Sequence, residues 1–132
     1  MIEVTEIYKS VQGESTYMGL PCIFIRLTGC NLRCVWCDTT HAFHNGDHLS
    51  IGQIIDQVKS HGINLVEITG GEPLLQKEVF PLMESLLKNK FKVMLETSGS
   101  LSIKSVPREV IKIIDIKCPG SGEEDKNLWE NL

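Results

Sequence analysis

The sequence predicts an α/β fold built on parallel strands, and three observations support this prediction. Short runs of β-branched and aromatic residues alternate with segments whose apolar residues recur at helical spacing. Each strand-like run ends in glycine or small polar residues, and the chain of 132 residues is the length of a single domain, 1–132. Alternating strands and helices favour right-handed crossovers, which place the strands parallel in one sheet.

Residues 22–27 are the first predicted strand, a short apolar run between a proline and a glycine. The first helix is expected to begin after Ser50, because Gln53 three residues later completes a capping box. Gly62 is a natural end for this helix. One apolar helical face is formed by Ile51, Ile54, Ile55 and Val58.

Residues 64–68 are the second predicted strand, and 77–90 the second helix. Pro81 fits that helix only in its first turn, where its missing N–H has no partner to lose. Residues 91–96 and 111–116 complete the set as the third and fourth strands. The core side of the second helix is expected to carry Val79, Leu82, Met83, Leu86 and Leu87.

The end of the chain leaves this sheet with an unprotected edge. Parallel sheets are normally covered on both faces and continued until their edges are protected. Here the sequence stops soon after the fourth strand, and Leu128, Trp129 and Leu132 have the spacing of a helix that has just begun. We therefore expect the sequence to be the front part of a longer domain; the alternative is that a partner chain covers the edge.

The composition excludes several classes of function. Hydrophobic residues make up 42% and charged residues 23%, which is typical of globular rather than disordered chains. A net charge of −4 argues against direct binding of nucleic acid, which needs a basic face. No apolar run approaches the ~20 residues of a membrane helix, and the first residues lack a signal peptide's pattern. We expect a cytoplasmic protein that does not contact membranes.

The turns after the four predicted strands are rich in glycine and small polar residues. Because parallel strands end at a common edge, these turns should lie together, where ligands of α/β folds bind. Glycine lets a ligand approach the backbone closely, so four such turns indicate a sizeable cofactor across the strand ends. The turns are 28–30, 69–73, 97–100 and 117–122.

Three of the five cysteines, Cys30, Cys34 and Cys37, fall within eight residues. Clustered thiols in a reducing compartment are more often metal ligands than disulfides. With His41 as a fourth ligand they would form a Cys3His zinc site. With iron and sulfide they would hold a four-iron cluster that leaves one iron open to a ligand. Of the other two, Cys22 fits a small core position, and the role of Cys118 stays open.

Two motifs resemble the signatures of one enzyme superfamily. The spacing of the three cysteines, with Trp36 directly before the third, resembles the cluster-binding signature of the radical S-adenosylmethionine (SAM) enzymes. The turn 69–73, Thr-Gly-Gly-Glu-Pro, resembles their second signature, which receives the methionine amino group of SAM. Two independent motifs in the expected order favour the iron–sulfur interpretation over zinc.

Within that superfamily the sequence is similar to the 7-carboxy-7-deazaguanine synthase family along its whole length. The resemblance implies a radical SAM type of fold, a partial (β/α) barrel of parallel strands that is incomplete at the C-terminal end of this sequence. The motifs that carry the resemblance are 11–14, Gly19-x-Pro21, 24–27, 36–39, 96–99 and 115–119.

This resemblance implies a reaction, its cofactors and its partners. The family uses a 4Fe-4S cluster, SAM and Mg2+ to convert 6-carboxy-5,6,7,8-tetrahydropterin to 7-carboxy-7-deazaguanine, with loss of ammonia. This carbon–nitrogen lyase step belongs to queuosine and 7-deazapurine biosynthesis. A deoxyadenosyl radical derived from SAM starts the ring contraction, so no protein residue is expected to be the radical source. A flavodoxin or ferredoxin as electron donor and a homodimer are also implied.

The resemblance also assigns roles to individual residues. The metal ligands would be Cys30, Cys34 and Cys37 for the 4Fe-4S cluster, and Thr39 for magnesium. SAM would contact Trp36, Cys37, Asp38, Gly71, Asp115, Ile116 and Lys117. The pterin would contact Val11, Gln12, Gly13, Arg26 and Thr69.

Arg26 also stands out without the resemblance, because it lies among apolar residues on a predicted strand. An unpaired guanidinium there would be costly, so an anionic partner is expected. That partner is either a substrate carboxylate, which suits bidentate pairing, or Glu14 in an internal salt bridge.

Two other interpretations of the sequence stay open. The chain could be a radical SAM activase that places a glycyl radical on a partner enzyme, or a zinc-stabilised binding module. A further polar group near the cysteines consists of Asp38, His41, His44, Asp47 and His48, and most of this stretch is interpreted as a solvated loop over the cluster rather than a metal site.

Overall fold

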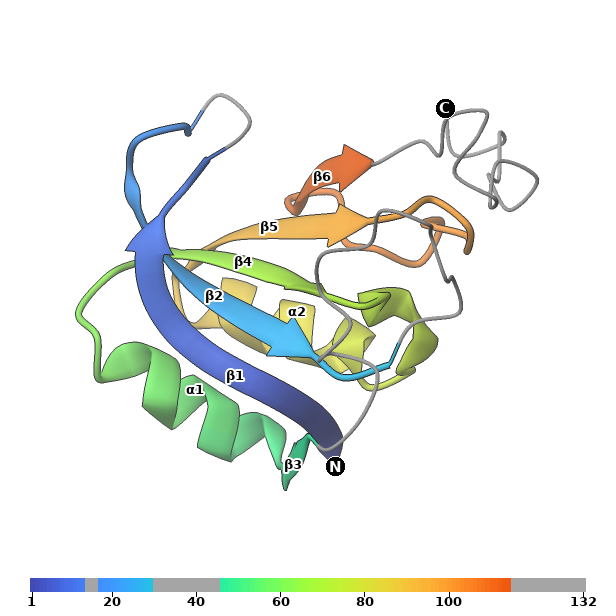
Figure 1. The fold of residues 1–132 in the computed structure, drawn as a ribbon, viewed down its shortest axis with the longest axis horizontal. Helices are drawn as coiled ribbons and strands as arrows, with labels where there is room; N and C mark the ends of the chain where they lie inside the picture. The colour runs from blue at the N-terminus through green and yellow to red at the C-terminus, as the bar shows by residue number, and fades with distance from the viewer. Residues whose placement is uncertain (14–16, 30–45, 115–132) are drawn as a thin grey trace.

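The computed structural model describes residues 1–13, 17–29 and 46–114, which form one six-stranded sheet with two helices packed on one face. The strand order is β3-β1-β2-β4-β5-β6. Figure 1 shows α2 behind β4, on the side of the sheet away from the viewer. The elements are β1 (Ile2–Val11), β2 (Pro21–Leu27), β3 (Asp47–Leu49), α1 (Ile51–Lys59), β4 (Leu65–Gly70), η2 (Pro73–Leu75), α2 (Val79–Lys88), β5 (Lys92–Thr97) and β6 (Ile111–Ile114).

The parallel part of the sheet confirms the predicted α/β class. β2, β4, β5 and β6 run parallel to one another, with α1 and α2 in the connections on either side of β4. Each of these elements was predicted, with most ends within two residues of their observed positions. The predicted fourth strand extended to residue 116, and its last two residues lie outside the described part.

The sheet is not wholly parallel, which corrects the sequence-based expectation. β1 pairs antiparallel with both β2 and β3, and neither strand was predicted. The register of β1 against β2 shifts between Val4 and Glu6, so the side chains that face the main core are Ile2 and Val4 before the shift and the partly buried Ile7 after it. This bulge breaks the two-residue period on which strand prediction depends.

Asp47 and His48 form a strand at the end of the stretch that was mostly interpreted as a loop. Both belong to β3, where His48 pairs with Glu3 and Asp47 with Val4 of β1. β3 is a short strand at the edge of the sheet. Its three residues carry no apolar pattern from which such a strand could be predicted. The other three members of that polar group lie outside the described residues.

The helix ends form as the sequence predicts. Ser50 accepts a hydrogen bond from the Gln53 N–H, and the Gln53 side chain accepts one from the Ser50 N–H, which completes the capping box. Pro81 lies in the first turn of α2. After α2 the chain turns at Lys90, whose φ of 69° is a conformation that glycine usually adopts at this place.

The main hydrophobic core lies between the sheet and the two helices. Alternate residues of β2, Ile23, Ile25 and Leu27, point into it and are fully buried. The core side of α2 is as predicted for its buried residues Val79, Leu82, Met83 and Leu86. A second, smaller cluster on the opposite face of the sheet contains Cys22, Leu65 and Met94. In the described part of the chain, no helix is long and apolar enough to cross a membrane.

Candidate functional site

The carboxyl ends of β2, β4 and β5 meet at one edge of the sheet, as the turn pattern predicts. Neighbouring strands are parallel: Leu27 and Gly70, the last residues of β2 and β4, are register partners, and Ile68 of β4 pairs with Leu95 of β5, two residues before each of these strands ends. The glycine-containing turns 28–29, 70–71 and 98–99 therefore lie at this edge, from which the cysteine loop also leaves β2. The fourth turn, 117–122, lies outside the described residues.

Glu72 connects two of these turns through hydrogen bonds of its side chain. Its side chain is completely buried and accepts hydrogen bonds from the Leu74 N–H (2.9 Å), the Ser98 N–H (2.8 Å) and the Ser98 hydroxyl (2.7 Å). The Thr97 hydroxyl adds a donor, 2.9 Å from both carboxylate oxygens. The Glu of the Gly-Gly-Glu-Pro turn thus fixes the ends of β4 and β5 relative to each other.

The third strand end joins the same structure through the backbone. The Glu72 N–H donates to the Gly29 carbonyl oxygen at 2.7 Å, directly before the cysteine loop. Gly70 has a φ of +151°, and a Cβ on this residue would lie only 2.4 Å from the Leu27 carbonyl oxygen. Only glycine fits there without moving backbone, so the turn brings β2 and β4 unusually close.

Gln76 links this edge to β1. Its Nε2 donates to the carbonyl oxygens of Glu3 (2.8 Å) and Thr28 (3.1 Å), while its Oε1 accepts from the Glu3 N–H (2.9 Å). The backbone before the cysteine loop is therefore held from both sides.

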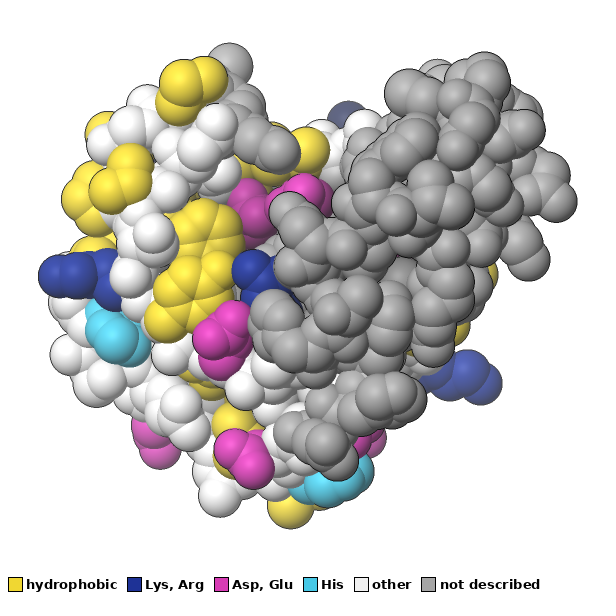
Figure 2. All heavy atoms as spheres, in the orientation of Figure 1, with side chains coloured by type: hydrophobic (Ala, Val, Ile, Leu, Met, Phe, Trp, Pro, Cys, Tyr) yellow, Lys and Arg dark blue, Asp and Glu magenta, His cyan; other side chains and the backbone are white. Residues whose placement is uncertain are grey.

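The sheet face opposite the helices carries a different set of side chains. Arg26 and Thr69 are register partners on β2 and β4, and one row deeper Glu67 lies between Phe24 and Met94. The Thr69 hydroxyl donates to Glu96 at 3.4 Å. Figure 2 shows hydrophobic, basic and acidic side chains side by side on the viewer's side of the molecule. We call this surface the open face.

Arg26 has its anionic partner on the neighbouring strand. Its Nε donates to Glu6 at 3.1 Å, and Nη2 donates to the Tyr8 hydroxyl at 2.9 Å. Burial alone would lower the pKa of Arg26, but the hydrogen bond to Tyr8 and the charge of Glu6 outweigh it and raise the pKa. The Tyr8 ring also stacks on Phe24, with ring centroids 5.3 Å apart.

This pairing changes the expectation for Arg26. The internal partner found is Glu6 rather than Glu14, which lies outside the described residues. Glu6 is nearly half exposed at its side chain, whereas the Arg26 side chain is mostly buried. An ion pair with an exposed carboxylate is screened by water and contributes little to stability.

Of the three neighbouring residues 11–13, only Gln12 faces the sheet. Val11 and Gly13 are exposed, while Gln12 is 2% exposed. The Gln12 Nε2 donates to Glu67 Oε1 at 2.6 Å, so its side chain lies over the middle of the open face. Glu67 itself is 1% exposed.

Cys22 is a core residue, as predicted. It is fully buried beside Leu65 and Met94, and burial together with the nearby charge of Glu67 raises the pKa of its thiol to about 12. A thiol so rarely ionised is a poor nucleophile and metal ligand.

Several predicted site residues lie outside the described part of the chain: Cys30, Cys34, Trp36, Cys37, Asp38, Thr39, Asp115, Ile116 and Lys117. Their assigned roles stay predictions. Among the described residues, no group of three side chains could hold a metal ion. Gly71 lies at the strand-end edge, and Arg26, Thr69 and Gln12 share the open face.

Sequence reasoning missed four residues that organise the site: Glu6, Tyr8, Glu67 and Glu72. Glu67 could have been found in the sequence, because it is the one charged residue within an otherwise uncharged predicted strand. Glu6 and Tyr8 depended on β1, which was not predicted. Glu72 was noted only as part of a motif.

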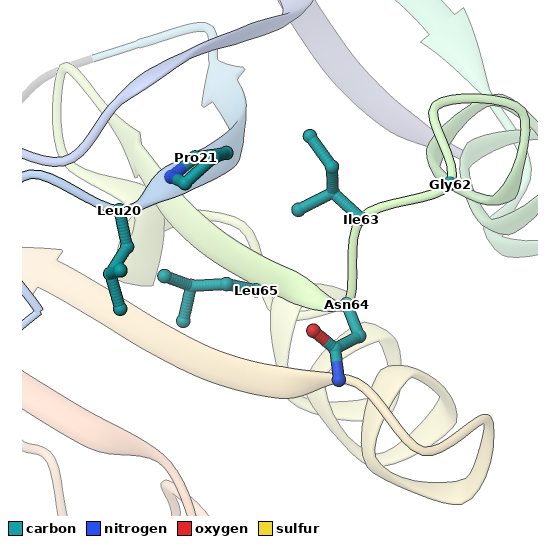
Figure 3. Close-up of a pocket in the computed structure, with 6 residues that line it drawn as sticks. All are labelled: Leu20, Pro21, Gly62, Ile63, Asn64 and Leu65. Carbon is teal, nitrogen blue, oxygen red and sulfur yellow. The ribbon is translucent and has the colours of Figure 1, made fainter.

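A pocket of about 380 Å³ lies at the other end of the strands (Figure 3). It is lined by Leu20, Pro21, Gly62, Ile63, Asn64 and Leu65, where β2 and β4 begin. It carries no ionisable side chain, so its lining differs from that of the strand-end edge and the open face.

Comparison with known proteins gives consistent matches. The sequence profile of the Radical SAM superfamily matches residues 24–116. The 7-carboxy-7-deazaguanine synthase of Koribacter versatilis (strain Ellin345) is 52% identical over 133 aligned positions, covering 99% of this chain and 59% of the relative. The protein of the same name from Chlorobaculum tepidum is 43% identical, covering 99% and 60%.

The fold has a solved counterpart. The crystal structure of QueE from Escherichia coli superposes with a TM-score of 0.79 at 28% identity, over 89% of this chain and 60% of that one. The chain thus spans about three fifths of the length of the relatives it matches. The superfamily profile covers most of the sequence, and the glycine-containing turns lie together at one edge of the sheet. The chain therefore belongs to the radical SAM superfamily.

Proposed function

We propose that the chain carries the SAM-binding and part of the pterin-binding machinery of a 7-carboxy-7-deazaguanine synthase. The substrate would be 6-carboxy-5,6,7,8-tetrahydropterin, and the product 7-carboxy-7-deazaguanine, formed with loss of ammonia. The observation that carries the proposal is Arg26, a mostly buried cation on the open face beside Thr69, in a chain similar to synthases of that name over nearly its whole length.

The cofactors follow from membership of the superfamily, which implies a 4Fe-4S cluster and SAM. Three cysteines would hold the cluster, an all-sulfur donor set typical of iron–sulfur proteins. Gly71 would contact SAM through its backbone, at an edge of the sheet where Glu72 is hydrogen-bonded to Ser98. When bound, the cluster and SAM supply the one-electron chemistry that starts the ring contraction.

The described residues bind and orient the pterin in this proposal. Arg26 would pair with the pterin carboxylate by exchanging the exposed Glu6 for it. Tyr8 would keep the guanidinium in place during this exchange, because its hydroxyl accepts from a different nitrogen. Thr69 and Gln12 would fix the pterin ring along the same face. Fixed orientation of the reacting atoms is the main contribution that a protein makes when the cofactor carries the chemistry.

Three further parts of the proposal rest on the family resemblance. Thr39 would contact a Mg2+ ion that also meets the substrate, a flavodoxin or ferredoxin would supply the electron, and the active protein would be a homodimer. A single hydroxyl is a weak ligand, so such an ion would keep several waters.

The test is anaerobic turnover. The reconstituted holoenzyme is incubated with the carboxylated tetrahydropterin, SAM and a reductant, and the product is identified by its absorbance and mass. We expect formation of the deazaguanine and regeneration of SAM. SAM cleavage without this product would contradict the proposal and favour an activase. Zinc without iron after reconstitution would favour a zinc-stabilised binding module.

A matched pair of cysteine variants sharpens this test. Cys34→Ala should lose the cluster and all turnover, measured as iron content and product. Cys22→Ala should keep both, because Cys22 is buried in the small core cluster. Loss of iron in Cys22→Ala but not in Cys34→Ala would contradict the ligand assignment.

A further inference from the structure

Two aromatic rings lie beside each other on the open face, next to Arg26. Tyr8 of β1 and Phe24 of β2 are register partners, and their rings stack with centroids 5.3 Å apart and planes 15° from parallel. Both residues are partly exposed. The proposed binding of the pterin carboxylate uses the Tyr8 hydroxyl and leaves the two rings without a role.

Packing accounts for only part of the surroundings of these rings. Phe24 packs against the small core cluster that contains Cys22. On β4 its register partner is the carboxylate residue Glu67, and the guanidinium carbon of Arg26 lies 6.0 Å from the centre of the Tyr8 ring. Aromatic surface that stays partly exposed among charged groups is suited to contact a flat ligand ring, because covering it removes apolar area from water.

The aromatic pair lies one row deeper along the sheet than Arg26. Arg26 pairs with Thr69 in the row nearest the carboxyl ends of the strands, and Phe24 pairs with Glu67 in the next row on the same face. Because a strand rises ~3.3 Å per residue, the two rows are ~7 Å apart. A ligand of two fused six-membered rings spans a similar distance, so with its carboxylate on Arg26 its far ring lies at the aromatic pair.

We propose that Tyr8 and Phe24 are specificity-determining residues whose rings contact the far, planar ring of the ligand that pairs with Arg26. This inference rests on the proposed function and deepens it, because it names a second contact by which the open face recognises a carboxylated pterin. The pyrimidinone ring of a pterin stays planar and conjugated in the tetrahydro form, so it can lie against aromatic side chains. An aliphatic carboxylate would find the charge of Arg26 but not this contact.

Tyr8 belongs to both contacts. Its hydroxyl accepts a hydrogen bond from Arg26 Nη2 at 2.9 Å, and its ring stacks on Phe24. Removing the hydroxyl should therefore affect only ligands that carry a carboxylate, whereas removing a ring should affect every pterin. This difference separates recognition of the ring from recognition of the charge.

The central experiment measures dissociation constants of two oxidised pterins that cannot be turned over, 6-carboxypterin and unsubstituted pterin, for the SAM-loaded holoenzyme. Equilibrium dialysis with detection of the pterin fluorescence gives both values. In Phe24→Leu we expect both ligands to bind about tenfold more weakly, as is typical of the loss of one aromatic stacking contact. Unchanged affinity for both pterins in this variant would overturn the inference.

The companion variant is Tyr8→Phe, which keeps the ring and loses the hydrogen bond to Arg26. We expect 6-carboxypterin to bind about fivefold more weakly and unsubstituted pterin to bind as in the wild type. An equal loss for both pterins would contradict the division of roles between the hydroxyl and the ring.

Two controls separate contact with the ligand from packing. Phe80→Leu makes the same exchange on α2, where Phe80 packs against the main core on the other side of the sheet, and should leave both affinities unchanged. Phe24→Leu should bind SAM as tightly as the wild type does. An equal loss of pterin affinity in Phe80→Leu, or a matching loss of SAM affinity in Phe24→Leu, would show that the effect is merely structural and overturn the inference.

Turnover is a separate readout from these affinities. If the holoenzyme forms no deazaguanine but shows the expected affinities, the proposed reaction fails and the ring contact stands. If it forms deazaguanine while Phe24→Leu binds both pterins as tightly as the wild type, the reaction stands and the ring contact fails. A wild-type holoenzyme that binds neither pterin would also overturn the inference.

Discussion

The two faces of the sheet are built from the same strands but contain very different side chains. On β2 and β4 the face toward the helices is apolar, with Ile25 and Ile68 fully buried in the main core. The open face carries Arg26, Glu67 and Thr69 on the positions directly next to them. Core residues and the proposed ligand-binding residues are thus separated by a single position along each strand, because successive side chains of a strand point to opposite faces.

The strand-end edge belongs to neither face, and it gives the largest expected effect. Glu72→Ala removes the acceptor for four buried donors, so we expect a loss of about 4 kcal/mol in the free energy of unfolding. The measurement is urea unfolding. Glu84→Ala, at an exposed position of α2, is the control and should change stability by less than about 0.5 kcal/mol. A loss below about 1 kcal/mol for Glu72→Ala would contradict the proposed role of Glu72 in fixing the turns.

The next effect compares truncations on the two faces. Ile68→Ala removes a fully buried side chain between sheet and helices and should cost about 3 kcal/mol. Ile113→Ala on the open face removes a partly buried one and should cost about 1 kcal/mol, because the surroundings can relax and water can enter. Thermal or urea unfolding of both variants measures the difference. Equal losses would show that the open face is packed as tightly as the covered one.

Cys22 gives a smaller effect that depends on pH. The thiol ionises near pH 9 in the unfolded chain, but only near pH 12 in the folded one. Above pH 9 the unfolded state therefore binds fewer protons than the native state, and stability falls with rising pH by about 1.4 kcal/mol per pH unit. Below pH 9 this contribution does not vary.

The measurement compares the stability of wild type and Cys22→Ala between pH 8 and pH 10.5. Other groups titrate in this range, so only the difference between the two proteins reports on Cys22. We expect the stability of Cys22→Ala to decline less steeply than that of the wild type. Parallel curves would mean that the thiol is not shielded on the open face.

The sequence predicted those elements whose signals are local. The start of α1 needed only Ser50 and Gln53, which lie three residues apart and cap each other as expected. The four parallel strands were predicted as short apolar runs. β1 was missed because its bulge changes the phase of burial between Val4 and Glu6, so no single alternation covers the strand.

The site residues could be predicted where they belong to a sequence motif. They could not be predicted where the site depends on contacts between distant parts of the chain. Arg26 was singled out as a buried cation, but its partner Glu6 depended on the unpredicted β1. Glu72 and Ser98 are 26 residues apart, and Gln12 and Glu67 are 55 residues apart. Such pairs follow only from the strand order, which places β2 between β1 and β4, and β5 on the other side of β4.

The central claim, that the open face binds the carboxylated pterin while the covered face stabilises the fold, is tested most directly on β2. The measurement is the dissociation constant of 6-carboxytetrahydropterin for the SAM-loaded holoenzyme, in Arg26→Met and in Ile25→Val. These neighbours point to opposite faces of one strand. We expect Arg26→Met to weaken binding about 100-fold, because a buried charge pair with the ligand is lost, and Ile25→Val to leave binding unchanged. Equal affinities for both variants and the wild type would contradict the claim.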